Sequence, residues 1–318
     1  MQIVRGWSGV DAHLRGASVA MGNFDGVHLG HRSVIDLARR DGAPLGIVTF
    51  EPHPRQVFAP HAPPFRLMNA ETRANRMARL GVEIVYELPF GPDLAELGAE
   101  AFAREVLAEG LGVSHVVVGA DFCFGKGRSG NAAALRDLGA ALGFDVTIAP
   151  LLGREDGTVS STAIRRALTD GRPGDAAAML GHWHRIDGAV LHGEKRGRDL
   201  GYPTANMSID GLHPPRFGVY AVRAEVLSGP HRGVHDGAAS IGVRPMFGEN
   251  AANLETYLFD FAGDLYDAHM SVALIAFLRG EERFDSLAAL TRQMERDCAQ
   301  ARAVLADAPP LSILGQAP

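Results

Sequence analysis

The sequence predicts an α/β domain over residues 1–181, followed by a small antiparallel β-barrel with a C-terminal helix over residues 182–318. In the first half, short apolar runs alternate with amphipathic segments, which is typical of a parallel sheet with helices on both faces. From residue 182, short strand-like runs are separated by glycine and proline, with no helical pattern for roughly a hundred residues. A chain of 318 residues also exceeds one ordinary domain.

The elements of the first half are predicted from their periodicity and their ends. Apolar runs bounded by turn residues indicate buried strands at residues 17–24, 44–50, 83–90, 114–122 and 144–150. Amphipathic segments that end in glycine, a common C-cap, predict helices at residues 31–42, 70–81, 98–112 and 131–143.

The second half is predicted as strands and one terminal helix. The strands fall at residues 186–193, 218–229, 237–243, 255–263 and 270–280. Residues 285–308 return to a helical pattern, with Asp285 or Ser286 as the N-cap. We expect the apolar stripe of this helix to pack on the barrel; it consists of Leu287, Leu290, Met294 and Ala301.

Composition narrows the class of protein. The net charge is −6 and no block of like charge stands out, which disfavours a general nucleic-acid binder. No run approaches the ~20 apolar residues of a membrane span, and the first residues lack the apolar core of a signal peptide. Cys123 and Cys298 fit neither a metal site nor a disulfide framework, so we expect a cytoplasmic protein.

The stretch "MGNFDGVHLGHRSVIDLARR", residues 21–40, links a predicted strand to a predicted helix. Its glycines do not have the dinucleotide-binding spacing, and His28 and His31 lack the further ligands of a zinc site. A helix that starts after a glycine turn points backbone N–H groups at an anion, and two imidazoles could hydrogen-bond a phosphate under attack. A plain surface loop remains the alternative from these residues alone.

Two further stretches of the first half favour a phosphate ligand. In "VSSTAIRRAL", Ser161 and Thr162 stand at a helix start with Arg165 one turn on, although an ordinary cap would look the same. The loop "VGADFCFGKGRSGN" follows a strand and could hold a planar ring and a phosphate, or be a tight turn with core phenylalanines. Its candidate residues are Asp121, Phe122, Phe124, Gly125 and Arg128.

The second half has its own candidate site. "GEKRGRDLGYPTANM" sets Lys195, Arg196 and Arg198 between glycines, which suits a turn over phosphates, although a basic hairpin is the alternative. Thr204 and Asn206 offer hard oxygen ligands for Mg²⁺. In "LETYLFDF", the carboxylate of Glu255 could accept the proton of an attacking hydroxyl, or be a plain exposed strand residue.

Together these motifs resemble the bifunctional riboflavin kinase/FAD synthetase family of bacteria. Over residues 17–170 the resemblance rests on "GNFDGVHLGHR", "TFEPHPRQVF", "VGADFCFGKGRSG" and "VSSTAIRRAL". Over residues 183–305 it rests on "GRDLGYPTAN", "FGVYAV", "SIGVRPMFGE" and "LETYLFDFAGDLYD". The resemblance implies a Rossmann-like H-x-G-H nucleotidylyltransferase domain and a riboflavin kinase barrel. The implied substrates are riboflavin, FMN and ATP with Mg²⁺, and FMN and FAD are the product ligands.

For the first domain the resemblance implies that ATP adenylylates FMN to FAD with release of pyrophosphate, and that His28 and His31 are catalytic. The implied ATP and phosphate contacts are Gly22, Asn23, Phe24, Asp25, His28, Gly30, His31, Ser161, Thr162 and Arg165. The 121–128 loop would line the nucleotide and flavin pockets.

For the second domain the resemblance implies phosphorylation of riboflavin by ATP, with Glu255 as catalytic base and Thr204 and Asn206 at Mg²⁺. The implied ATP contacts are Gly193, Arg198, Gly201, Pro203, Thr204 and Asn206. Two alternatives stay open: an FMN adenylyltransferase with a non-catalytic flavin-binding barrel, and a flavin sensor without activity.

The chain departs from the family pattern at a few positions. Cys123 stands where the family usually has arginine, and Val243 and Met246 replace residues of another motif. Asp267 stands in place of a glycine, so we expect an aspartate in a left-handed turn conformation, which aspartate tolerates better than most residues.

Overall fold

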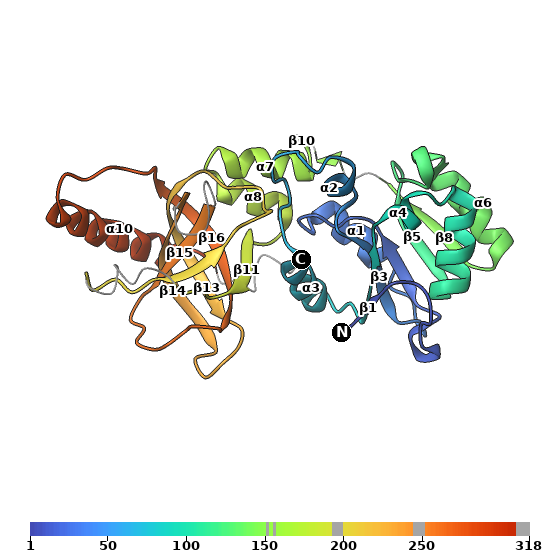
Figure 1. The fold of residues 1–318 in the computed structure, drawn as a ribbon, viewed down its shortest axis with the longest axis horizontal. Coiled ribbons are helices and arrows are strands. Elements are labelled where there is room, and N and C mark those ends of the chain that lie inside the picture. The colour runs from blue at the N-terminus through green and yellow to red at the C-terminus, as the bar shows by residue number, and fades with distance from the viewer. Residues whose placement is uncertain (151–152, 155–156, 193–199, 244–251, 310–318) are drawn as a thin grey trace. The chain divides into compact units, whose positions relative to one another are not determined.

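The computed structural model describes residues 1–150, 153–154, 157–192, 200–243 and 252–309. By their contacts these residues form two compact units (Figure 1). The first unit consists of Met1–Ala62 and Arg73–Val159, and the second of Pro63–Thr72 and Ser160–Pro318. The segment that follows residue 159 therefore packs with the second unit, and the proposed division of activities at residues 181/182 stays a prediction.

The core of the first unit is a parallel six-stranded sheet, as the strand–helix alternation predicts. Its order is β1-β4-β3-β2-β5-β8. The strands are β1 (Gln2–Arg5), β2 (Ser18–Met21), β3 (Leu45–Glu51), β4 (Ile84–Pro89), β5 (His115–Gly119) and β8 (Asp145–Ala149). Four short strands complete the region: β6 (Cys123–Phe124) pairs with β7 (Gly130–Asn131), and β9 (Gly153–Arg154) with β10 (Gly157–Thr158).

Helices flank this sheet, and their bounds differ from the predicted ones in places. They are η1 (Ala12–Leu14), α1 (Leu29–Leu37), α2 (Pro54–Phe58), α3 (Ala70–Arg79), α4 (Pro92–Ala95), α5 (Ala99–Ala101), η2 (Phe102–Leu111), η3 (Lys126–Arg128) and α6 (Ala132–Leu142). The predicted end of α1 at Gly42 is wrong, because the last turn of the helix tightens at Ala38, whose N–H bonds back to the Ile35 carbonyl. Gly143 is the C-cap of α6, at the predicted end of this helix, and Asn131 is its N-cap.

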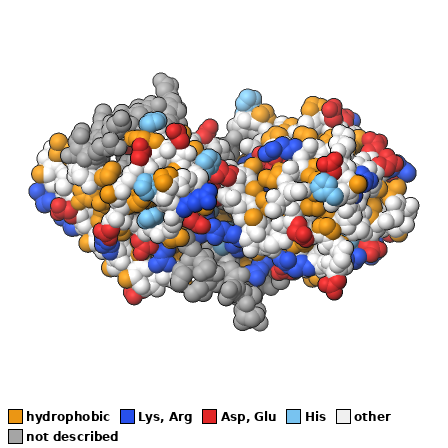
Figure 2. Space-filling view, turned by 90° about the horizontal axis from the view of Figure 1, so that it is seen from below, with side chains coloured by type: hydrophobic (Ala, Val, Ile, Leu, Met, Phe, Trp, Pro, Cys, Tyr) orange, Lys and Arg blue, Asp and Glu red, His pale blue; other side chains and the backbone are white. Residues whose placement is uncertain are grey.

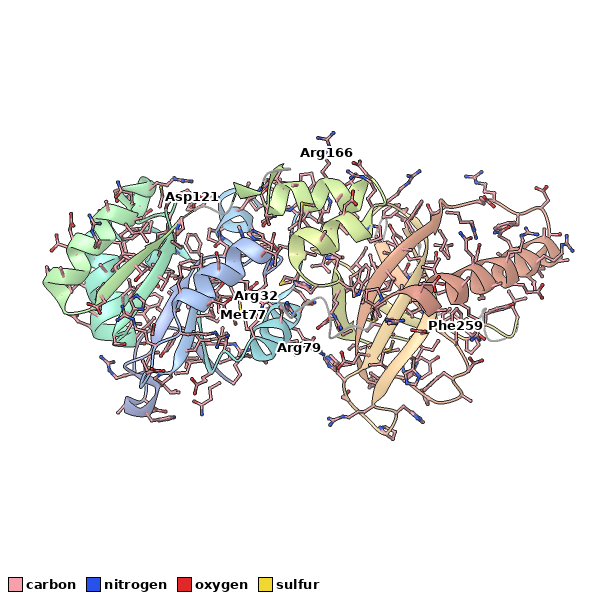
Figure 3. The ribbon with its side chains drawn as sticks, turned by 180° about the vertical axis from the view of Figure 1, so that it is seen from behind. Arg32, Met77, Arg79, Asp121, Arg166 and Phe259 are labelled. Atoms are coloured by element: carbon pink, nitrogen blue, oxygen red, sulfur yellow. The ribbon has the colours of Figure 1, made fainter. Side chains whose placement is uncertain are left out.

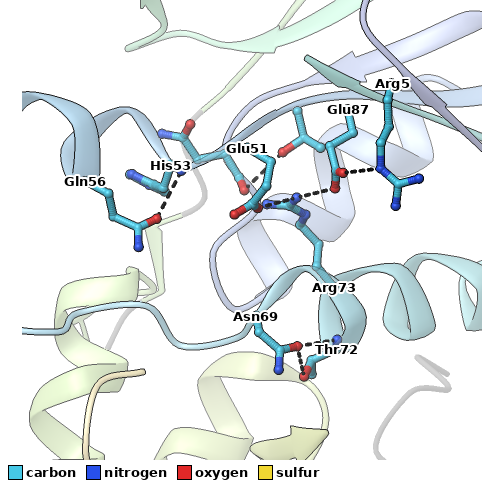
Figure 4. A network of polar contacts seen from close by, with 10 residues as sticks. Arg5, Glu51, His53, Gln56, Asn69, Thr72, Arg73 and Glu87 are labelled. Atoms are coloured by element: carbon cyan, nitrogen blue, oxygen red, sulfur yellow. Dashed lines mark hydrogen bonds and ion pairs between the residues drawn. The ribbon is translucent and has the colours of Figure 1, made fainter. Parts of the chain in front are cut away.

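A buried ion-pair network ties α3 to the sheet (Figure 4). The Arg73 guanidinium lies 2.9 Å from a carboxylate oxygen of Glu51 and 3.0 Å from one of Glu87, and Arg5 also pairs with Glu87. The same figure shows Gln56 accepting the backbone N–H of His53, which closes a capping box on α2. The ion pairs thus hold α3 to the carboxyl-terminal parts of β3 and β4, and the separate capping box closes the start of α2.

The second unit is built on an antiparallel six-stranded sheet with the order β11-β16-β13-β14-β15-β12. A bridge between Leu191 and Asn206 joins its two end segments, which makes the sheet nearly barrel-shaped. The strands are β11 (Arg185–Ala189), β12 (Ala205–Ser208), β13 (Gly218–Val226), β14 (Gly233–Val243), β15 (Ala252–Leu258) and β16 (His269–Arg279).

Three helices complete the second unit: α7 (Ser161–Thr169), α8 (Pro173–Leu180) and α10 (Leu287–Asp307). Ser286 is the N-cap of α10, as one of the two predicted candidates. The predicted stripe is wrong at Leu287, which is exposed, because the helix packs on the outer face of the sheet through Ala301 and Leu305 further along. Figure 3 labels Phe259, next to the end of β15, whose ring lies under the Arg302 guanidinium of α10.

Asp267, one of the departures from the family pattern, has the backbone conformation predicted for it. Asp267 has φ of 61°, so it adopts the left-handed conformation predicted for a position that is usually glycine.

Figure 2 shows charged side chains of both signs scattered among apolar and neutral ones over the face in view.

Candidate functional sites

The strand order of the first unit indicates a candidate ligand site. The chain runs from β2 outward through β3 to β4, and then returns to the other side of β2 for β5 and β8. The order therefore reverses between β2 and β5, and parallel α/β sheets bind ligands outside the carboxyl ends of strands at such a point. The chain that leaves these two ends contains His28 and, in the first turn of α1, His31 after β2, and Asp121 and, in η3, Arg128 after β5.

His28 and His31 form a stacked pair at the start of α1. Their ring centroids are 3.7 Å apart and the planes differ by 13°. The Nδ1 atom of His28 accepts the backbone N–H of His31 at 3.2 Å, so His28 is the N-cap and a neutral His28 ring carries its proton on Nε2. Gly30 gives the His28 ring its room, because a Cβ atom there would lie 3.1 Å from the ring and would require the ring to shift by a few tenths of an ångström.

Both rings are neutral at pH 7. Burial lowers the pKa of His28 from 6.5 to about 4, although its backbone hydrogen bond acts in the opposite direction. Burial also lowers the pKa of His31 well below 6.5, and the neighbouring His28 charge lowers it further. Each neutral imidazole offers one N–H, and these two donors stand beside the free N–H groups of the α1 N-terminus. The arrangement suits an anion such as a phosphate.

The backbone before the histidines is strained. Phe24 and Val27 have φ of 50° and 45°, which is rare for residues other than glycine and clusters at functional sites. Phe24 is 1% exposed and its ring meets His31 edge to face at 5.3 Å. We therefore reassign Phe24 from a ligand contact to a support of the His31 ring. Of its predicted neighbours, Asp25 is buried, Asn23 is exposed and Gly22 is half-buried.

The loop after β5 presents polar groups on a rigid turn. Asp121, labelled in Figure 3, and Arg128 are exposed, and Phe122 is half-buried. Gly125 has φ of 74° and a Cβ there would lie 2.7 Å from the Ala99 nitrogen, so only glycine fits. Phe124 belongs to the core, where its ring lies 5.6 Å from that of Phe102. We therefore also reassign Phe124 from ligand contact to support of this loop.

An aromatic group at the same edge of the sheet is not predicted from the sequence. Phe58, at the end of α2, is 71% exposed, and its ring meets Phe90 edge to face at 5.5 Å. Phe90 directly follows β4 and also meets Phe50 of β3. A large exposed aromatic side chain beside the carboxyl ends of the strands offers a face on which a planar ligand could stack. No local pattern in the sequence distinguishes this exposed phenylalanine from the buried ones nearby.

The motif around Ser161 belongs to the second unit. The Ser160 side chain accepts the backbone N–H of Ala163 at 3.2 Å and so caps α7. Thr162 is exposed, and the Arg165 guanidinium lies 5.5 Å from the Phe65 ring and donates to the Phe65 carbonyl. Because this motif and the histidines belong to different units, their shared phosphate site stays a prediction.

Residues of the second predicted site meet on the outer face of the sheet. Asn206 of β12 pairs directly with Glu255 of β15, so both side chains point to the same face. The neighbouring Leu254 and Thr256 point to the opposite face, into the core. The register of two antiparallel strands therefore places the predicted cation ligand beside the predicted base.

A third residue links these two. The side-chain NH₂ group of Asn253 donates to Asn206 Oδ1 and to Glu255 Oε1, each at 3.3 Å. The Asn206 NH₂ group in turn donates to the Thr204 carbonyl at 3.3 Å. Gly201 has φ of 82° in the turn before Pro203. The remaining predicted ATP contacts, Gly193 and Arg198, lie outside the described residues, as do Lys195, Arg196 and Met246.

Two family models match the chain, one in each half. The model described as FAD synthetase matches residues 10–163, and the one described as riboflavin kinase matches residues 180–305. The chain belongs to the bifunctional riboflavin kinase/FMN adenylyltransferase family. It is 41% identical to the member from Pseudomonas fluorescens over 96% of this chain and 98% of the relative. It is 38% identical to the member from Escherichia coli K12 over 95% and 97% of the two chains.

A solved structure has the same fold over both units. It is the crystal structure titled as a macrolide-efflux protein from Streptococcus pneumoniae, with 30% sequence identity and a TM-score of 0.79. The match covers 96% of this chain and 99% of that one. In the part of the present chain that the structure describes, no helix is long and apolar enough to cross a membrane.

Proposed function

We propose that residues 1–181 transfer the adenylyl group of ATP to FMN, and that residues 182–318 phosphorylate riboflavin to FMN. The two activities follow from membership of the family. The assignment of one activity to each segment, and of the residues named below to each reaction, is the proposal. The observation that supports it best is the pair of separate polar sites, one at the switch point of the parallel sheet and one on the outer face of the antiparallel sheet.

In adenylyl transfer, a phosphate oxygen of FMN attacks the α-phosphorus of ATP, and the bond to pyrophosphate breaks. No protein nucleophile is needed, because positioning and charge stabilisation lower the barrier. We assign the N–H donors of His28 and His31, with the N-terminus of α1, to the phosphate oxygens. Arg165, Ser161 and Thr162 are further phosphate contacts in this proposal, and Asp121, Phe122 and Arg128 line the flavin and nucleotide pocket.

In riboflavin phosphorylation, the terminal hydroxyl of the ribityl chain attacks the γ-phosphorus of ATP, and the bond to ADP breaks. Glu255 takes the proton of that hydroxyl. Asn206 and Thr204 hold the nucleotide at the neighbouring strand. Since Glu255 stands directly opposite Asn206, the base and the phosphates meet across one pair of strands.

Asn206 and Thr204 fit a role at Mg²⁺, which when bound would neutralise phosphate charge. The Asn206 oxygen accepts one hydrogen bond from Asn253, and a carbonyl oxygen has a second lone pair for a cation. Both ligands are neutral oxygens, and no group of three or more acidic, histidine or cysteine side chains among the described residues could hold a metal by itself. The cation is therefore expected to arrive with ATP, whose phosphates supply the remaining charge.

The alternative of adenylyl transfer alone is not supported, because the riboflavin kinase model matches the barrel and the Asn206–Glu255 pair is assembled there. Cys123 and Cys298 are free thiols, which suits the cytoplasmic location that we also propose.

The product assay tests this function directly. Purified protein given riboflavin and Mg-ATP should form FMN first and FAD later, and protein given FMN should form FAD. The products are separated by chromatography and detected by their absorbance. FAD from FMN but not from riboflavin would support the adenylyltransferase alternative, and tight flavin binding without ATP turnover would support the sensor.

Phe58→Ala is expected to raise the KM for FMN about tenfold, since stacking of an aromatic side chain on a heterocycle contributes ~1–3 kcal/mol. The kcat for FAD formation should change little, because Phe58 contacts no reacting atom in this proposal. Steady-state kinetics with FMN checks this. Phe58→Trp retains an aromatic face and should restore the KM. An unchanged KM in Phe58→Ala would remove Phe58 from the flavin site.

A further inference from the structure

We propose that Asn253 is a positioning residue for riboflavin phosphorylation, an inference that rests on the kinase activity proposed above. Asn253 lies two residues before Glu255 on the same strand and therefore on the same face. It is 1% exposed, although it points to the outer face of the sheet. A buried amide is costly unless its hydrogen bonds are made, and in the described residues the Asn253 NH₂ group makes two whereas Oδ1 has no partner, so the contacts of the NH₂ group indicate its role.

The NH₂ group of Asn253 donates hydrogen bonds to both candidate functional residues, Glu255 and Asn206. One N–H donates to Glu255 Oε1 and the other to Asn206 Oδ1, each at 3.3 Å. The orientation of the amide follows from these partners, because a flipped Asn253 would face the Glu255 carboxylate with a second acceptor. In the same way, the Asn206 amide is fixed by its donation to the Thr204 carbonyl.

These contacts set the direction of both functional groups. The Glu255 carboxylate accepts a hydrogen bond from Asn253 through Oε1, which restricts the rotation of the carboxylate that is to take the proton of the attacking hydroxyl. Asn206 has its amide oxygen turned to the same side as Glu255. Asn253 therefore fixes the base relative to the nucleotide ligand, and a shift of about an ångström between such groups can cost ~100-fold in rate.

Three proteins test this role: Asn253→Ala, Asn253→Asp and the control Ser208→Ala. Ser208 pairs directly with Asn253 across the strands, but its side chain is exposed and its hydroxyl oxygen accepts the Asp210 N–H in its own turn. Kinase kcat and riboflavin KM are measured separately, riboflavin binding is followed by quenching of its fluorescence, and FMN adenylylation in the same preparations reports folding.

Asn253→Ala should lower kinase kcat at least tenfold, with riboflavin KM and binding within about twofold of wild type and FMN adenylylation unchanged. Asn253→Asp keeps the shape but has no donor and sets a second carboxylate beside Glu255, so its kcat should fall further. Ser208→Ala should match wild type.

Wild-type kinase kcat in Asn253→Ala would overturn the proposal. So would an equal loss of both activities in the Asn253→Asp variant, which indicates a merely structural role. A wild-type protein that makes no FMN would instead refute the kinase function itself.

Discussion

His28→Ala or His31→Ala is expected to lower FAD formation from FMN at least ~100-fold, the effect of removing one donor from developing charge in a transition state. A neutral ring has a single N–H, and in the proposed site each ring would donate it to a phosphate, so the loss of one ring would remove one donor entirely. His28→Ala also removes the N-cap of α1, and we therefore expect a loss of stability of about 1 kcal/mol in addition. Steady-state FAD formation from FMN and thermal unfolding check the two effects.

The same variants should phosphorylate riboflavin at the wild-type rate, because the kinase residues belong to the other compact unit. His13→Ala is the matched control, since His13 is an exposed histidine of the same unit on η1. Wild-type FAD formation in both histidine variants would remove these side chains from the adenylyl transfer. An equal loss of both activities would contradict two separate sites.

Glu255→Gln is expected to lower riboflavin phosphorylation ~100- to 10,000-fold, the contribution of a general base to proton transfer. Glutamine keeps the size of the side chain and can still contact Asn253, but it cannot take the proton of the attacking hydroxyl. The rate of FMN formation at saturating riboflavin and Mg-ATP measures the effect.

Conversion of FMN to FAD by Glu255→Gln should equal that of wild type, which controls for folding. Glu295→Gln, an exposed carboxylate on α10, should leave both activities unchanged. Unaltered FMN output from Glu255→Gln would exclude Glu255 as the base. The kinase would then act by positioning its two substrates, without a general base at this residue.

The two architectures could be predicted because their signals are local and repeated. The helix at 131–143 has its asparagine and glycine caps in the sequence, and the structure places them at the helix ends. The antiparallel half follows from alternating strands and the absence of a helical period. The functional pairing of Asn206 with Glu255, in contrast, depends on the register of two strands nearly fifty residues apart, and periodicity alone does not fix a register.

The features of the structure that the sequence did not predict have no local sequence pattern that would indicate them. Strand β1 has only four residues, two of them polar, and forms because β4 offers it an edge. The helix of residues 102–111 is a π-helix, although its amphipathic pattern looks like any α-helix. Phe124 and Phe58 are both phenylalanines of candidate motifs, and only the tertiary packing shows that the first is buried and the second is exposed.

The most direct test of two separate sites is a crossed assay of wild type, His28→Ala and Glu255→Gln. Each protein receives Mg-ATP with either riboflavin or FMN, and the flavins are separated by chromatography. His28→Ala should accumulate FMN from riboflavin without FAD, and Glu255→Gln should make FAD from FMN but nothing from riboflavin. A mixture of the two variants should convert riboflavin to FAD. Loss of the same step in both variants, or a mixture that makes no FAD, would contradict this account.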